Sequence, residues 1–142
     1  MKNNAIGMFL ALGAACVCGS ALDAQSNELS AKVPFAFQVA GKDFAAGRYV
    51  VRDHGYLGIP SVQNAATGEL VFVAGADHAL TQAGAPRLVF HCYAGNTCYL
   101  AEIRPASGSG SHVAMTKAEK EIANSNRHRE MATISVDLRR AD

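Results

Sequence analysis

The stretch Leu88 to Ile103, LVFHCYAGNTCYLAEI, decides the fold of this 142-residue chain, because it has the pattern of one β-hairpin. Two strand-like runs, Leu88 to Cys92 and Cys98 to Ile103, flank a five-residue polar tip. Within the tip, Gly95 and Asn96 tolerate the positive φ angles that hairpin turns use. The stretch therefore predicts two antiparallel strands joined by a longer loop.

The cysteines of this stretch, Cys92 and Cys98, predict a register. If they face each other, antiparallel pairing places one further residue pair on the same face of the hairpin and another pair on the opposite face. These pairs are Phe90 with Leu100 on the cysteine face, and His91 with Tyr99 on the other.

Residues 1–24 have the pattern of an export signal peptide, which is removed from a mature protein. Lys2 supplies a positive charge, and the apolar run Ala5 to Val17 has the length of a signal-peptide core. That run is shorter than the roughly 18 to 20 residues that a transmembrane helix needs. We predict cleavage after Ala24, with Ala21 as the alternative, and a single exported domain, periplasmic or secreted, over residues 25–142. A buried helix of a cytosolic protein is the less favoured interpretation.

Cysteine usage agrees with export. Cys16 and Cys18 lie within the predicted signal, so Cys92 and Cys98 remain as an even pair in an oxidising compartment, where a disulfide is the default. A lipid anchor on Cys16 or Cys18 is disfavoured, because neither follows a leucine at the third position before it. No transmembrane anchor is expected once the signal is removed.

The charge of the chain argues against a nucleic-acid partner. Removing residues 1–24 takes away Lys2 from 13 Lys and Arg residues and Asp23 from 12 Asp and Glu residues, which leaves the domain close to neutral. The basic residues Arg127 to Arg129 and the pair Arg139 and Arg140 each precede an acidic residue, and we interpret both groups as solvated surface.

Several other segments have strand or loop patterns. Alternation from Val33 to Val39 predicts one half-buried strand, and Arg48 to Asp53 predicts another. Glu69 to Ala74 is uniformly apolar and predicts a central, buried strand. The stretch Gly75 to Arg87, with its glycines, proline and small residues, predicts a loop.

The C-terminal third predicts a flexible connector, a helix and a last strand. Residues 104–115 contain the sequence RPASGSGS and predict the connector. Thr116 and Glu119 have capping-box spacing and predict a short helix over residues 117–124. Ala132 to Leu138 alternates weakly and predicts either a last strand or an ordered tail. We predict an all-β, mainly antiparallel fold: a small β-sandwich or barrel of about six to eight short strands with one short C-terminal helix.

Five short motifs carry a resemblance to a known group of proteins. They are V-P-F-x-F-x-V (Val33 to Val39), A-G-x-Y-x-V (Ala46 to Val51), L-V-F-H (Leu88 to His91), Y-L-x-x-I (Tyr99 to Ile103) and K-A-E-x-E-I (Lys117 to Ile122). Together they resemble a group of small exported bacterial β-domain proteins of unassigned function. The resemblance implies an export signal and a compact β domain that ends in a short helix, and it transfers no catalytic residue.

Two Asp-His pairs are the candidate chemical groups. Asp53-His54 and Asp77-His78 lie at predicted turns, where they could bind a metal or perform acid–base chemistry. The favoured interpretation is that these are turn residues with exposed histidines. We therefore assign no catalytic residue, no metal site and no cofactor.

The sequence favours an exported, non-enzymatic binding or structural module, whose partner would be an envelope or extracellular protein. It does not indicate the ligand. The alternative is a small hydrolase or a metal-dependent enzyme that uses the two Asp-His pairs.

Overall fold

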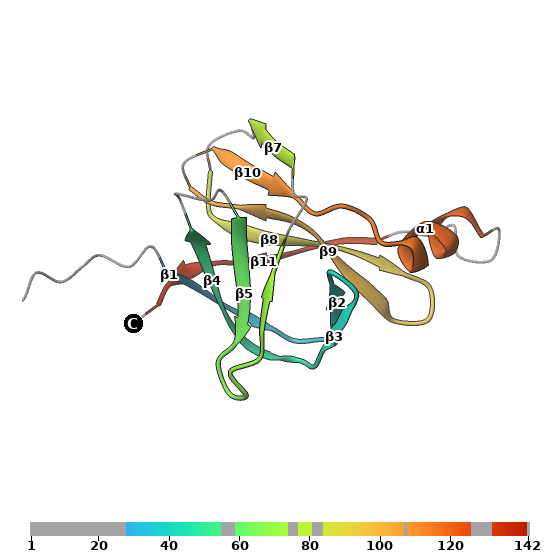
Figure 1. The fold of residues 1–142 in the computed structure, drawn as a ribbon, viewed down its shortest axis with the longest axis horizontal. Helices are drawn as coiled ribbons and strands as arrows, with labels where there is room; N and C mark the ends of the chain where they lie inside the picture. The colour runs from blue at the N-terminus through green and yellow to red at the C-terminus, as the bar shows by residue number, and fades with distance from the viewer. Residues whose placement is uncertain are drawn as a thin grey trace, which may run out of the picture.

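A computed structural model describes residues 28–54, 59–73, 77–80, 84–106, 108–125 and 132–141, except for the side chains of residues 77–80 and 109. These residues form an all-β fold of two sheets with a sandwich-like layout and one short helix (Figure 1), as the sequence predicts. None of the helices in these ranges is long and apolar enough to cross a membrane.

The two sheets are built almost entirely from antiparallel pairs. The first has the order β12 (Arg139–Arg140), β1 (Glu28–Val33), β4 (Gly47–His54), β5 (Ile59–Asn64) and β6 (Leu70–Phe72). The second has the order β11 (Ala132–Asp137), β8 (Arg87–Tyr93), β9 (Thr97–Arg104), β10 (Ser109–His112) and β7 (Asp77–Leu80). The hairpin of β2 (Phe37–Val39) and β3 (Lys42–Phe44) joins the second sheet through a parallel contact of β2 with β9. There are more short strands than the six to eight expected, because strands of two to four residues are too short to show periodicity.

The β8–β9 hairpin has the predicted register. Cys92 pairs with Cys98, and the neighbouring pairs on the two faces are Phe90 with Leu100 and His91 with Tyr99. At the tip, Gly95 and Asn96 have φ angles of 93° and 62°, which is the positive region that the turn was expected to need.

The chain changes sheet inside the segment Val33 to Val39, so the prediction of one continuous strand there is wrong. β1 ends at Val33 in the first sheet, and β2 begins at Phe37 in the second. The break follows from Pro34, which has no N–H to donate to a strand ladder. Val33, Phe37 and Val39 are nevertheless all buried, because the crossing keeps their side chains in the core.

The core between the sheets is rich in aromatic rings. The Phe37 ring packs edge-on against Tyr49 and Phe90, with centroid distances of 4.9 and 5.2 Å. The hydroxyl of Tyr49, a fully buried residue, donates to the carbonyl of Ala45 and accepts a hydrogen bond from Asn64 Nδ2 at 3.2 Å. Such satisfied polar groups fix the arrangement of a core in addition to apolar packing.

Three predicted segments differ from the structure. The run Glu69 to Ala74 is not a central strand: β6 lies at the edge of the first sheet, where Leu70 and Phe72 are 37% and 53% exposed while Val71 is buried. The connector over residues 104–115 is not wholly irregular, because Ser109–His112 forms β10. Its partner β7 lies within the predicted loop from Gly75 to Arg87. Strands of glycine and serine pair through their backbones, so they leave little apolar pattern in the sequence.

The helix α1 (Lys117–Asn124) has the predicted bounds. Thr116 is its N-cap and accepts a hydrogen bond from the backbone N–H of Glu119 at 3.2 Å. The Glu119 side chain, however, is buried and hydrogen-bonded to the hydroxyl of Tyr93 on β8, instead of completing a capping box. The helix is therefore anchored to the sheet by a carboxyl group.

Candidate functional site

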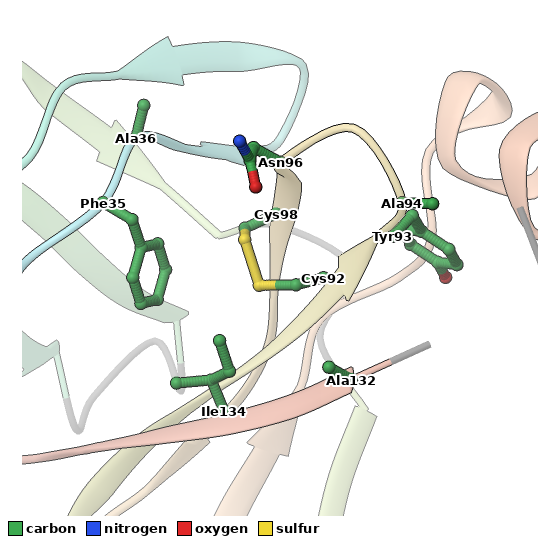
Figure 2. Close-up of a pocket in the computed structure, with 9 residues that line it drawn as sticks. All are labelled: Phe35, Ala36, Cys92, Tyr93, Ala94, Asn96, Cys98, Ala132 and Ile134. Atoms are coloured by element: carbon green, nitrogen blue, oxygen red, sulfur yellow. A yellow bond between two sulfur atoms is a disulfide. The ribbon is translucent and has the colours of Figure 1, made fainter. Parts of the chain in front are cut away.

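An apolar cavity lies beside the tip of the β8–β9 hairpin. In Figure 1 this hairpin runs past the end of the first sheet, so the core-facing side of its tip is not covered by that sheet. The cavity has a volume of about 690 Å³. Its lining residues are Phe35, Ala36, Cys92, Tyr93, Ala94, Asn96, Cys98, Ala132 and Ile134, which Figure 2 shows.

The predicted disulfide forms one wall of this cavity. Cys92 on β8 and Cys98 on β9 are bonded, with their Cα atoms 4.0 Å apart. Both are buried, at 8% and 6% exposure, because the disulfide faces the interior of the hairpin. The bridge ties β8 and β9 together next to the turn at the tip of the hairpin.

Apolar side chains from two other segments flank the disulfide. Phe35 comes from the crossing between β1 and β2, and its ring packs edge-on against Phe90 at a centroid distance of 5.1 Å. Ile134 comes from the edge strand β11 and remains 36% exposed. In Figure 2 both side chains lie next to the disulfide, with the amide of Asn96 above it and the ring of Tyr93 turned away. The site offers an apolar surface with one hydrogen-bonding amide at its rim.

On the opposite face of the same hairpin, α1 covers a buried polar cluster. The Tyr93 hydroxyl donates to Glu119 Oε1 at 3.3 Å, and His91 Nδ1 lies 3.7 Å from the same oxygen. Burial raises the pKa of the Glu119 carboxyl, although its contacts with Tyr93 and His91 act in the other direction. Burial, together with the nearby Glu119 charge, raises the pKa of Tyr93 to about 12. The cluster holds α1 against the sheet and is covered by it.

A second polar group on this sheet is more accessible. Glu102 on β9 accepts a hydrogen bond from Arg104 and lies 3.6 Å from Nδ1 of His112 on β10. The hydrogen bond from Arg104 is the main reason that the pKa of Glu102 is lowered. Across the described ranges, no group of three or more His, Cys, Asp and Glu side chains could hold a metal ion.

The candidate pair Asp53-His54 lies at the end of β4 instead of in a turn, so that prediction is wrong. The pairing of β4 with β5 extends to His54, which faces Ile59. His54 is half-buried: its Nε2 lies 3.0 Å from Ser61 Oγ, and its ring is 5.5 Å from that of Phe72. Cross-strand pairing, which the local sequence did not indicate, brings these groups together.

The contact between His54 and Ser61 has the distance of a nucleophile and its general base. Ser61, however, is only 1% exposed, so its hydroxyl cannot reach a substrate carbonyl. The pair is therefore a structural hydrogen bond between neighbouring strands. The other candidates, Asp77 and His78, begin β7, and their side chains lie outside the described residues.

Comparisons with family models, curated proteins and solved structures found no match to this chain. The resemblance to small exported β-domain proteins stays a prediction, and any functional conclusion depends on the geometry of the sites.

Proposed function

We propose that the protein is an exported binding module without catalytic activity, and that an apolar part of its ligand occupies the cavity beside the Cys92–Cys98 disulfide. The observation that carries this proposal is the cavity itself. A volume of about 690 Å³ lies within the range of 300 to 1,000 Å³ that is usual for small-molecule sites.

The chemistry of the walls supports an apolar, uncharged ligand. Phe35, Ile134 and the disulfide present carbon and sulfur atoms, and none of the nine lining residues carries a formal charge at neutral pH. The amide of Asn96 could give one directional hydrogen bond. Such a ligand would remove the exposed part of Ile134 from water, which is favourable.

The same wall supports binding by a preformed site. A disulfide restricts the separation of β8 and β9, so less conformational freedom is lost when a ligand binds. Binding is favoured over the hydrolase alternative because the Ser61 hydroxyl that His54 contacts is buried. Export is supported by the signal pattern of residues 1–24 and by a disulfide that suits an oxidising compartment.

A substitution in the cavity wall tests the proposal. Ile134→Lys places a charge in the wall, whereas Leu70→Lys places the same charge on edge strand β6 of the other sheet, at nearly equal exposure (36% and 37%). The probe is N-phenyl-1-naphthylamine, an uncharged apolar dye whose fluorescence rises when it leaves water.

We expect the wild-type protein and Leu70→Lys to bind the dye equally well, and Ile134→Lys to bind it at least tenfold more weakly, because a charge in an apolar site must keep its water. Circular dichroism confirms that both variants fold. Equal dye binding by all three folded proteins, or no binding by the wild type, would contradict the proposal.

A further inference from the structure

Four basic side chains line a second cavity, on the side of the domain where β11 passes into β12 beside β1. This cavity has a volume of about 400 Å³. Its lining residues are Ser30, Ala31, Lys32, Arg48, Val136, Asp137, Arg139 and Arg140. The basic residues come from three strands that are far apart in the sequence, and one carboxylate, that of Asp137, accompanies them.

Strand pairing concentrates three of these positive charges on one face of the first sheet. Lys32 on β1 lies directly opposite Arg48 on β4. On the other side of β1, Arg139 lies opposite Ser30, which points to the same face as Lys32 because the two are separated by two positions. This is the outer face, since the alternating residues Ala31 and Val33 are buried in the core.

None of the described residues neutralises the four basic side chains of this cavity through an ion pair. Among the described residues, the side chains of Lys32, Arg48, Arg139 and Arg140 make no hydrogen bond or ion pair, and all four residues are exposed. Like charges directly opposite each other destabilise a pair of strands.

The same two strands contain a contrasting pair. Arg52 on β4 lies opposite Glu28 on β1, and its Nε donates to Glu28 Oε1 at 2.5 Å. Its Nη1 also donates to Gln63 at 2.6 Å. Arg52 is therefore satisfied by the protein, whereas the Lys32–Arg48 pair four residues away has no hydrogen-bond acceptor among the described residues.

We propose that this cavity is an anion-binding site that takes a phosphate group. Arginine side chains present planar sets of N–H donors that match the oxygens of a phosphate, and lysine adds a mobile point charge. Four cationic groups around one cavity exceed the single Asp137 carboxylate, so a phosphate anion gains more attraction than repulsion there. The phosphate belongs either to a free small molecule or to a phospholipid headgroup, because both present negatively charged phosphate oxygens to the arginine and lysine donors.

The test compares two double variants that lose the same total charge. Lys32→Gln/Arg139→Gln removes two cations from the cavity, and Lys42→Gln/Lys120→Gln removes two exposed cations from β3 and α1. One arm measures the binding of inorganic phosphate by calorimetry in a buffer free of other oxyanions. The other arm measures sedimentation with vesicles of phosphatidylglycerol and phosphatidylcholine, against vesicles of phosphatidylcholine alone.

We expect the wild type and the control variant to bind in at least one arm, and the cavity variant to bind at least tenfold more weakly in that arm. Binding should also weaken as sodium chloride is raised. Loss in the phosphate arm identifies a site for a free phosphate compound. Loss in the vesicle arm alone identifies a headgroup site. The proposal is overturned if the wild type binds neither probe, or if the two double variants weaken binding equally, because net charge would then account for the effect.

Discussion

Opening the Cys92–Cys98 disulfide is expected to lower the free energy of unfolding by about 2 kcal/mol. The two cysteines are six positions apart, so the covalent loop is short. The chain-entropy relation for such a loop gives about 2 kcal/mol at 25 °C, because the bridge restricts the unfolded chain more than the folded one. For a domain of this size that loss corresponds to a fall in melting temperature of roughly 6 to 12 °C.

The fold itself should survive reduction. The register of the hairpin is also fixed by buried packing of Phe90 and Leu100 and by the positive-φ turn at Gly95 and Asn96, none of which needs the sulfur bridge. The assay is a thermal melt of the exported protein, followed by circular dichroism with and without reductant, with thiols counted in both samples.

The control is the variant Cys92→Ala/Cys98→Ala, whose melting temperature should not respond to reductant. A wild-type melt that stays unchanged while two thiols are released would refute the loop-entropy argument. Complete unfolding of the reduced protein at 25 °C would refute the claim that packing and turn geometry hold the hairpin.

The other predictions concern single groups. Tyr49→Phe should cost about 1 to 2 kcal/mol in urea unfolding, because it removes a buried hydroxyl that both donates and accepts a hydrogen bond. Burial raises the pKa of Glu119 above its ordinary value of 4.5, so the folded protein binds the carboxyl proton more tightly than the unfolded chain does. The stability that this group contributes is therefore lost as the pH rises above 4.5. Glu119→Gln, which cannot ionise, should therefore gain stability relative to wild type as the pH rises from 4 to 8, in thermal melts across that range. His54→Ala should lower the free energy of unfolding in urea by about 1 kcal/mol, because the contact with Ser61 is lost. A change near zero would show that this contact does not stabilise the fold. Intact-mass analysis of the exported protein should show a chain that begins at Gln25; a retained N-terminus or a lipid-modified cysteine would contradict the signal prediction.

Local sequence was sufficient for elements whose pattern and contacts lie close together in the chain. The β8–β9 hairpin combines alternating apolar residues with a Gly95-Asn96 turn, and its register followed from one cysteine pair. The helix bounds followed from Thr116, whose side chain caps the helix in the expected manner. In both cases the deciding interactions are local: Cys92 and Cys98 are six positions apart, and Thr116 and Glu119 are three positions apart.

The two cavities could not be predicted, because distant segments build them. Phe35 and Ile134 line one cavity although they are far apart in the sequence. Lys32 and Arg139 line the other cavity together only because β12 pairs with β1. The role of Glu119 could not be predicted for a related reason. Its spacing from Thr116 predicts a capping box, but its side chain is hydrogen-bonded to Tyr93, which is distant in the sequence. Apolar runs also mislead at edges, as Phe72 shows by remaining exposed on β6.

The pairing of β12 with β1 also determines how the domain would respond to mechanical force. The backbone N–H of Ala141 donates to the carbonyl of Glu28 at 3.0 Å, so the first and last described segments lie side by side at one edge of the first sheet. Because β1 and β12 are antiparallel, a force that separates Glu28 from Ala141 would break the hydrogen bonds between the two strands one after another. In a shear geometry, by contrast, all of these bonds would resist the force together. β12 would peel from β1 first and β11 from β8 next, while the loop closed by Cys92 and Cys98 could not lengthen. An unfoldase that pulls on the C-terminal strand would therefore unfold the domain at lower force than a shear geometry requires. The loop closed by Cys92 and Cys98 would stay closed, so the pore of the unfoldase would have to be wide enough for it.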